Sequence, residues 1–254
     1  MSADHTAPSS GKTALLLGAT GAVGKETLAE LLSTSHFSQV HSFGRRPSGQ
    51  THAKLTEHNV DFEKLANGDA TEADKLRNVR ADAVLIALGT TRGDAGSAQK
   101  FERIDREYVI AAAKAARNEA VEGQRVAYIS STGANAKAPF LYMKSKGLTE
   151  LGIASSGYPS SYLFRPGFLY DANREKPRAL EKVYGIFTHH ILSRVSGNAE
   201  IHVPLLAKAF VATAAKGDEW LKSNAAGKPL DGAEKGATMV DNADAVKLAK
   251  AEQQ

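Results

Sequence analysis

The stretch TALLLGATGAVGKETL, residues 13–28, places Gly18, Gly21 and Gly24 three residues apart, between an apolar run and a helix-like segment. A glycine turn after a buried strand lets the backbone approach phosphate groups, and the N–H groups that open the next helix favour negative charge. The pattern is G-x-x-G-x-x-G rather than G-x-G-x-x-G, and a plain strand-to-helix turn is the alternative. The context favours a site for a dinucleotide pyrophosphate.

The second apolar stretch, Val40–Phe43, is followed by Gly44, Arg45 and Arg46. At this point a site for NAD normally carries an acidic residue that binds the ribose 2′-hydroxyl. Guanidinium groups instead bind a 2′-phosphate through charge-assisted, often bidentate hydrogen bonds. The sequence therefore predicts NADP(H) over NAD(H), with a solvated basic turn ahead of Pro47 as the alternative.

Composition and charge are typical of a single α/β domain. The 254 residues are 42% hydrophobic, which suffices for one full core. The chain has no Cys, which excludes disulfides, thiol nucleophiles and cysteine-bound metals. The net charge of +4 is small and no Lys/Arg block occurs, so we expect no nucleic-acid partner.

The first residues and one internal stretch bear on where in the cell the protein is located. Residues 1–12 have neither a secretion signal's apolar core nor an Arg-rich presequence, so we expect a flexible leader in an intracellular protein. No run of about eighteen apolar residues predicts a transmembrane helix. Residues 183–195 (VYGIFTHHILSRV) form either a core or substrate-pocket helix or a surface for a bilayer or protein partner. His189 and His190 there are adjacent, so they form no i, i+4 metal pair, and no metal is predicted.

Apolar runs alternate with helix-like segments, which predicts a Rossmann-type, doubly wound parallel sheet. The predicted strands are Thr13–Leu17, Val40–Phe43, Val60–Phe62, Ala83–Leu88, Val126–Ser130 and Tyr162–Phe164. The predicted helices are Glu26–Leu32, Phe101–Arg117, Tyr142–Ile153 and a closing helix, Asp241–Ala251, with Asp241 as its cap. Residues 217–238 are expected to be a loop, and residues from about 170 onward a small substrate-side extension of the single domain.

Asp61 and Phe62 lie in the predicted third strand, Val60–Phe62. In a nucleotide-binding fold Asp61 suits a hydrogen bond to the adenine amino group, and Phe62 suits the wall of the adenine slot. A turn-capping Asp and a core Phe are the alternatives.

Tyr142 and Lys146 lie four residues apart on a predicted helix, so they share one face. An adjacent ammonium lowers the pKa of a tyrosine from its ordinary value of about 10, which makes the hydroxyl usable as a general acid or base. Ser131, at the end of the preceding strand, can hold and polarise a substrate carbonyl. Tyr-x-x-x-Lys alone means little, but here it follows the glycine turn, the paired arginines and a Ser-Ser pair in order.

These stretches together resemble the atypical short-chain dehydrogenases/reductases, a branch that includes the HIV-Tat-interacting oxidoreductase-like protein and fungal proteins of the mitochondrial surface. The resemblance spans most of residues 13–170. It is carried by GATGAVGKETL, FGRRP, VDFEKL, ALGTTRGDAG, FERIDREYV, FLYMKSKG and LFRPGFL.

The resemblance implies an NADP(H)-binding Rossmann fold, with Tyr142 as the proton donor or acceptor and Lys146 as a contact of the nicotinamide ribose. The residues expected to contact the cofactor are Gly18, Thr20, Gly21, Ala22, Val23, Gly24, Arg45, Arg46, Asp61, Phe62, Ala87, Leu88, Gly89, Tyr142, Lys146 and Leu169. Ser131 stands closer to Tyr142 than is usual in classical members, so Ser130 or Thr132 is an alternative carbonyl ligand. Beyond residue 175 the resemblance thins, and the substrate is unreadable.

We therefore expect an NADPH-dependent oxidoreductase that reduces an aldehyde, ketone or quinone. An NADPH-sensing regulator or scaffold with little turnover is the alternative, although such a protein needs no Tyr-Lys pair. We expect a monomer or homodimer with a small-molecule substrate, and a peripheral membrane or protein partner is open. By resemblance alone, the location is the cytoplasm or the cytosolic face of the mitochondrial outer membrane.

Overall fold

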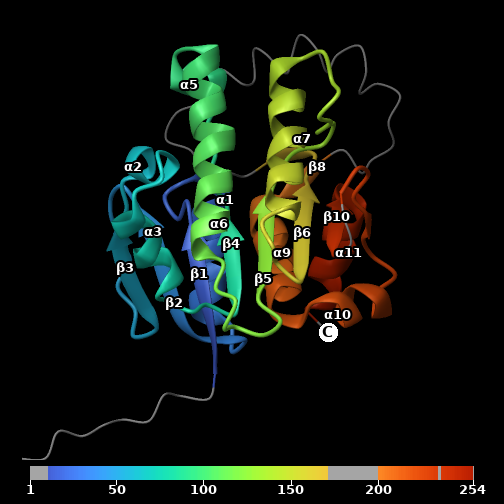
Figure 1. The fold of residues 1–254 in the computed structure, drawn as a ribbon. Helices are drawn as coiled ribbons and strands as arrows, with labels where there is room; N and C mark the ends of the chain where they lie inside the picture. Colours follow the sequence, from blue (N-terminus) through green and yellow to red (C-terminus); the bar gives the residue numbers. More distant parts are fainter. Residues whose placement is uncertain (1–10, 171–199, 234–235, 254) are drawn as a thin grey trace, which may run out of the picture.

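The computed structural model describes residues 11–170, 200–233 and 236–253 (Figure 1). Within these residues one sheet contains eight strands, in the order β3 (Leu55–Asn59), β2 (Phe37–Gly44), β1 (Lys12–Leu17), β4 (Ala83–Ile86), β5 (Arg125–Ile129), β6 (Ser160–Arg165), β10 (Ala237–Asp241) and β9 (Lys228–Pro229). All neighbours are parallel except β9 and β10. The strand order reverses between β1 and β4, the point at which nucleotides bind in such sheets.

The inner strands are continuous apolar runs because helices cover both of their faces. In β1 residues 14–17 are all buried, and all four residues of β4 are buried beside them. The edge strand β3 contains only half-buried and exposed residues instead. Burial on both faces therefore fixes the centre of the sheet.

Two helical layers enclose the sheet (Figure 1). One apolar cluster joins Leu16 of β1 to Leu28 and Phe210, which belong to the layer of α1 (Ala22–Ser33), α9 (Val203–Lys216) and α11 (Asn242–Ala251). The other cluster joins Leu15 and Leu17 to the layer of α2 (Phe62–Ala66), α3 (Ala70–Arg77), α6 (Tyr108–Ala116) and α7 (Leu141–Ala154). Because successive side chains of β1 point to opposite faces of the sheet, this strand contributes to both cores.

The segment between β4 and β5 begins with the short helices α4 (Arg92–Ala95) and α5 (Ala98–Glu102). It continues through η1 (Arg103–Glu107), a π-helical turn, directly into α6. A π turn adds a residue to the helix and changes the direction of the side chains on either side of it, which often happens at functional sites.

The predicted fold class, a doubly wound parallel sheet, is confirmed. Five predicted strands match β1, β2, β4, β5 and β6, with ends that differ by one to three residues. The predicted helices correspond to α1, to the α5–η1–α6 stretch, to α7 and to α11, whose cap Asp241 accepts a hydrogen bond from the Asp244 amide at 2.9 Å. β1 begins at Lys12, the last residue of the expected leader.

The third strand was predicted wrongly. It is Leu55–Asn59, and the segment Val60–Phe62 leads into α2. The run LTEHN carries one apolar residue because β3 is an edge strand with half-exposed faces, so the apolar Val60 and Phe62 gave a misleading signal. Val60 and Phe62 are buried where the chain enters α2, and neither belongs to a strand.

The expected loop at 217–238 was also wrong in part. It contains α10 (Asp218–Ser223), β9 and the start of β10, which extends the main sheet beside β6. In addition, β7 (Phe168–Tyr170) pairs with β8 (Glu200–His202) in a small parallel sheet. Much of the C-terminal part, including α9, thus belongs to the sheet and its helical layer.

Several sequence expectations fall outside the described residues. These are residues 1–10 of the leader and the stretch 183–195 with its two histidines. Within the described part of the chain, no helix has the length and apolar character needed to cross a membrane. The same part contains no group of three or more residues suited to bind a metal ion.

Candidate functional site

The glycine turn connects β1 to α1 at the carboxyl edge of the sheet. Gly18 has a φ of +92°, and a Cβ added there would lie 2.7 Å from the backbone of Ala87. A Cβ on Gly24 would lie 1.9 Å from the carbonyl oxygen of Gly18. Two of the three glycines are therefore required by close backbone approach, because the turn packs against both the β4 loop and α1.

The start of α1 offers its backbone amides to a ligand. Gly21 is the N-cap residue, and no side chain caps the helix. The turn is held by a hydrogen bond from the Gly21 amide to the Gly18 carbonyl at 3.0 Å. An uncapped helix start that faces a glycine turn fits a pyrophosphate, so the residues present suit a dinucleotide.

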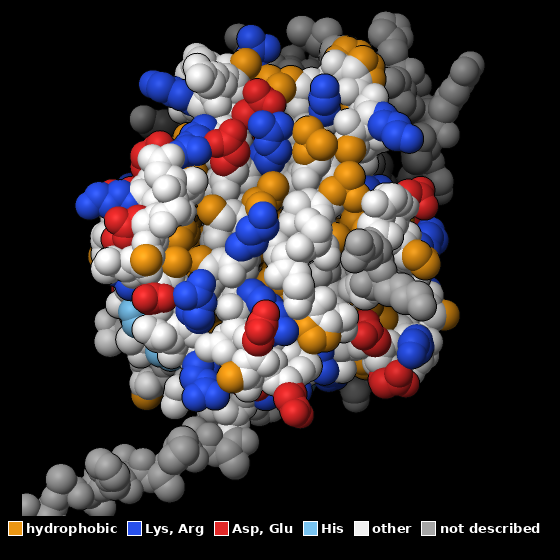
Figure 2. Space-filling view, in the orientation of Figure 1, with side chains coloured by type: hydrophobic (Ala, Val, Ile, Leu, Met, Phe, Trp, Pro, Cys, Tyr) orange, Lys and Arg blue, Asp and Glu red, His pale blue; other side chains and the backbone are white. Residues whose placement is uncertain are grey.

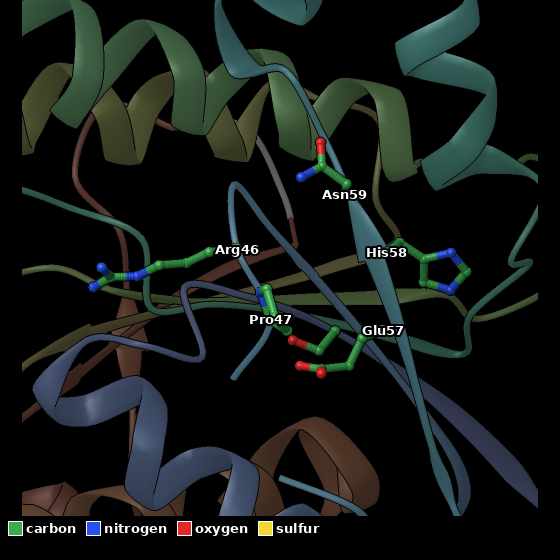
Figure 3. Close-up of a pocket in the computed structure, with 6 residues that line it drawn as sticks. Arg46, Pro47, Glu57, His58 and Asn59 are labelled. Atoms are coloured by element: carbon green, nitrogen blue, oxygen red, sulfur yellow. The ribbon is translucent and has the colours of Figure 1, made fainter. Parts of the chain in front are cut away.

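Arg45 and Arg46 lie just beyond β2, and both are exposed. Two residues of β3 hold this loop: the Asn59 amide group donates to the Arg45 carbonyl at 3.1 Å, and Glu57 Oε1 accepts from the Ser48 amide at 2.6 Å. Figure 3 shows the guanidinium group of Arg46 extending away from the Glu57 carboxylate. Both residues line a pocket of about 190 Å³. The geometry leaves the Arg46 side chain available to an anion.

The structure gives Asp61 and Phe62 local roles. Asp61 Oδ1 accepts hydrogen bonds from the amides of Glu63 and Lys64, both at 3.0 Å, and so caps α2. Phe62 is buried and stacks on Tyr108 with ring centroids 5.9 Å apart. These are the turn-capping and core alternatives of the sequence analysis, and the adenine contacts stay predictions.

The loop after β4 passes close to both the glycine turn and α7. Ala87 and Leu88 are half-buried, and their backbone lies against Gly18. A Cβ on Gly89 would lie 3.0 Å from Asp105 Oδ1 and 3.6 Å from Lys146 Nζ. This loop therefore connects the expected pyrophosphate region to the expected catalytic pair.

Tyr142 and Lys146 lie in the first two turns of α7, on the helical layer that covers β5. Tyr142 is half-buried, with its ring 6.0 Å from that of Phe101. Lys146 is 5% exposed, and the neighbouring Lys144 is exposed. The two lysines thus differ: Lys146 is buried and Lys144 is exposed to solvent.

The ammonium group of Lys146 has two partners that the sequence analysis missed. It donates to the Tyr128 hydroxyl at 2.8 Å and lies 3.1 Å from Asp105 Oδ1. Burial lowers the pKa of Lys146, but the Asp105 carboxylate and the hydroxyls of Tyr128 and Tyr142 outweigh burial and raise it. Burial also raises the pKa of Tyr128 well above its ordinary value. Lys146 is therefore charged and Tyr128 neutral.

The three candidate carbonyl ligands after β5 differ in their surroundings. Ser130 is buried, and its hydroxyl finds no partner among the described residues. Ser131 is half-buried and donates weakly to the Thr132 carbonyl at 3.3 Å. The Thr132 hydroxyl is engaged by the carbonyls of Arg165 and Pro166, at 3.1 and 2.9 Å. Thr132 thus ties the loop to the β6 end, which leaves the two serines.

The β6 end is held by a strong ion pair. Arg165 forms a bidentate contact with the buried carboxylate of Glu150, at 2.9 and 2.6 Å. The hydrogen bonds that Arg165 donates to Glu150 raise the pKa of Arg165. Arg165 thus has the structural role of joining β6 to α7.

Leu169 follows in β7 and packs against the core, flanked by exposed Phe168 and Tyr170.

Asp105 and Tyr128 had weak signals in the sequence. Asp105 lies in FERIDREYV on the apolar side of a helix, where a buried acid is unusual and needs a partner. Tyr128 stands inside the apolar strand VAYIS. Neither shares an element with Lys146, so only the fold brings them together.

Comparison with known proteins finds a family model and two named relatives that cover much of the chain. Residues 18–194 match the family model described as NAD(P)H-binding. The chain is 35% identical over 163 residues to "Protein FMP52, mitochondrial" of Candida albicans, which covers 63% of this chain and 68% of that protein. It is 34% identical over 171 residues to "Protein HTATIP2" of Rattus norvegicus, which covers 65% of this chain and 66% of that protein.

Solved structures share the fold at low identity. A short chain dehydrogenase family protein from Francisella tularensis aligns with a TM-score of 0.62 and 14% identity, over 91% of this chain and 96% of that one. The enzyme WbmH of Bordetella bronchiseptica, solved in complex with NAD+, aligns with a TM-score of 0.59 and 18% identity, over 81% and 73%.

Proposed function

The chain belongs to the NAD(P)H-binding family, and on this premise we propose that it is an NADP(H)-dependent oxidoreductase that reduces a carbonyl compound. Its Rossmann-like fold and its relatives agree with the resemblance to atypical short-chain dehydrogenases/reductases. The observation that supports the reaction most is the buried, charged Lys146, one turn from Tyr142 on α7.

In the proposed reaction, NADPH supplies the hydride that adds to the carbonyl carbon. The Tyr142 hydroxyl donates a proton to the carbonyl oxygen, so the product is an alcohol. Lys146, charged and buried, stabilises the phenolate that Tyr142 becomes. Ser131 holds the carbonyl oxygen through its hydroxyl, with Ser130 as the alternative.

The cofactor is proposed to bind across the glycine turn, with its pyrophosphate at the start of α1. Arg45 and Arg46 would bind the 2′-phosphate, since both are exposed and their loop is held by Glu57 and Asn59. We expect a preference for NADP(H) because two guanidinium groups stand where a site for NAD normally has a carboxylate that binds the ribose 2′-hydroxyl.

Cofactor preference is tested by titrating NADPH and NADH against the parent and the variant Arg45→Ala/Arg46→Ala. Because a charged hydrogen bond contributes about 1.5–3 kcal/mol, the ratio of the two affinities should fall by about 10-fold or more, mainly through weaker NADPH binding. Arg92→Ala, an exposed arginine after β4, is the matched control. An unchanged ratio in the double variant would refute the NADP(H) assignment.

The alternative is an NADPH-sensing protein with little turnover. An NADPH-oxidation screen over aldehydes, ketones and quinones separates the two functions. Binding of NADPH without turnover on any compound would favour the sensor, and turnover on at least one would favour the enzyme.

For partners and location we propose a small-molecule substrate and no nucleic acid. Figure 2 shows basic and acidic side chains interspersed on the face that it draws, rather than one large basic field. Because the fungal relatives are named mitochondrial, we propose peripheral attachment at the cytosolic face of the mitochondrial outer membrane. Release of the protein from mitochondria by high salt or carbonate is expected, and recovery only in the soluble fraction would contradict it.

A further inference from the structure

Lys146 carries a charge on a side chain that is almost fully buried. Its side chain is 7% exposed, and its ammonium group lies between α7, β5 and η1. Removing an ammonium group from water costs several kcal/mol, and a buried lysine without compensation releases its proton instead. Some group on the protein must therefore offset this cost.

Within the described residues, three titratable groups face Lys146. Tyr142 shares its helix, Tyr128 comes from β5, and Asp105 comes from η1. Tyr128 is neutral and contributes a hydrogen bond at 2.8 Å, whereas Asp105 supplies a carboxylate oxygen at 3.1 Å. The buried acid of α7, Glu150, is instead paired with Arg165.

The fold places the Asp105 carboxylate at this contact although burying it is energetically unfavourable. Its side chain is completely buried, and Oδ1 also accepts a hydrogen bond from the Thr90 amide at 3.2 Å, while Oδ2 finds no partner among the described residues. The π turn places the carboxylate against α7, and Gly89 leaves it room, because a Cβ there would crowd Oδ1 at 3.0 Å. A half-satisfied buried carboxylate is costly without a facing cation.

We propose that Asp105 is the counter-ion that keeps Lys146 protonated in its buried position, which makes Asp105 a positioning residue for the Tyr142–Lys146 pair. Its role in the reaction rests on the proposed function, but the charge pairing itself does not. The pairing is therefore tested on the protein without cofactor or substrate.

The test compares urea unfolding of the parent and Asp105→Asn between about pH 7 and about pH 9.5. In the unfolded chain Lys146 has a pKa of about 10.4, and without its counter-ion the folded value falls below this. The unfolded state then binds more protons than the folded state, so the stability of Asp105→Asn rises with pH relative to the parent. We expect the stability gap to shrink by about half or more over this range.

Two further variants keep the result specific. Tyr128→Phe removes the neutral partner, so its gap to the parent should stay constant over the same range. Adding Lys146→Met to Asp105→Asn removes the unpaired charge and should recover stability at about pH 7, even if Asp105→Asn alone is too unstable to unfold cooperatively. A pH-independent gap for Asp105→Asn, or no recovery in the double variant, would overturn the proposal.

Activity supplies a second readout. NADPH turnover by Asp105→Asn should fall as pH rises through the lowered pKa of Lys146. Turnover by the parent should show no such decrease over the same pH range. A merely structural loss would lower turnover equally at every pH. If the parent shows no turnover at all, the proposed function fails while the unfolding comparison still decides the pairing.

Discussion

At the residue scale, the distance to neighbouring backbone atoms decides which glycines of the turn could carry a side chain. Gly18 and Gly24 face backbone atoms at distances that no Cβ tolerates, whereas a Cβ on Gly21 would lie 3.4 Å from the nearest atom, the Gly18 carbonyl oxygen. The three glycines of the opening motif are therefore not equivalent, although the sequence pattern treats them alike.

This difference gives a direct prediction. Gly24→Ala must push α1 away from the turn, which should cost about 1–3 kcal/mol of stability and weaken NADPH binding. Gly21→Ala, with a φ of −78° and no clash, should cost less than about 1 kcal/mol. Urea unfolding and NADPH titration measure both variants, and equal losses for the two would contradict the packing described here.

The sequence could locate the residues whose neighbours lie within one motif. Tyr142 and Lys146 share a helix face, and Arg45 and Arg46 follow a strand end, so spacing alone places them. It could not find Asp105 and Tyr128 as partners of Lys146, because these lie 41 and 18 positions away on other elements. Their meeting depends on how η1, β5 and α7 pack.

At the element scale, the end of α9 depends on two cations from other strands. Lys12 of β1 donates to the Ala215 carbonyl at 2.6 Å, and Arg125 of β5 donates to the carbonyls of Ala214 and Ala215, at 3.4 and 3.0 Å. The last carbonyls of a helix have no partners within the helix, and positive charge there is favourable. These contacts attach α9 to the amino ends of the central strands.

Arg125→Met should therefore loosen α9. We expect a loss of about 1–2 kcal/mol in urea unfolding and faster amide exchange in the last turn of α9 than in α7. Lys247→Met, which removes an exposed contact to the Ala225 carbonyl, is the matched control and should lose less. Unchanged exchange in α9 would show that the cap does not hold this helix.

The closing helix α11 is attached in a pH-dependent way. Glu252 accepts from Lys216 at 2.5 Å and contacts His36 at 2.8 Å. Burial opposes the charge on Glu252, but these partners outweigh burial and lower the pKa of Glu252. A lowered folded pKa stabilises the protein above the unfolded value of about 4.3, and this contribution is lost as pH falls through the folded value.

Glu252→Gln should thus be less stable than the parent near neutral pH, and the difference should shrink as the pH falls below about 4.3. Unfolding midpoints measured from about pH 3 to about pH 7 test this. A difference that stays constant down to the lowest pH would mean that the carboxylate charge is not what attaches α11.

Elements were predictable from the sequence where burial was complete. The apolar runs of β1, β4 and β5 report strands covered on both faces, and their predicted positions are confirmed. β3 and β9 lie at the sheet edges, where half the side chains face solvent and the apolar signal fades. The errors at Val60–Phe62 and 217–238 both fall next to these edges.

At the scale of the whole molecule, the sheet brings four separate segments to one edge. The glycine turn follows β1, the arginines follow β2, Gly89 follows β4, and α7 begins after β5. Because parallel strands share the direction of their carboxyl ends, these segments lie in one row across the sheet, in the order arginines, glycine turn, Gly89 and α7. The topology therefore brings the candidate cofactor-binding and catalytic residues to one edge, while it does not determine the substrate.

The most direct measurement is NADPH oxidation by the parent protein and Tyr142→Phe, over a panel of aldehydes, ketones and quinones, with NADPH affinity measured alongside. A general acid contributes about 10²–10⁴-fold to rate. We predict turnover by the parent on at least one compound, at least about 100-fold slower turnover by Tyr142→Phe, and NADPH affinity within about twofold of the parent. Equal turnover by Tyr142→Phe would contradict the role of Tyr142, and NADPH binding without turnover on any compound would contradict the reductase itself.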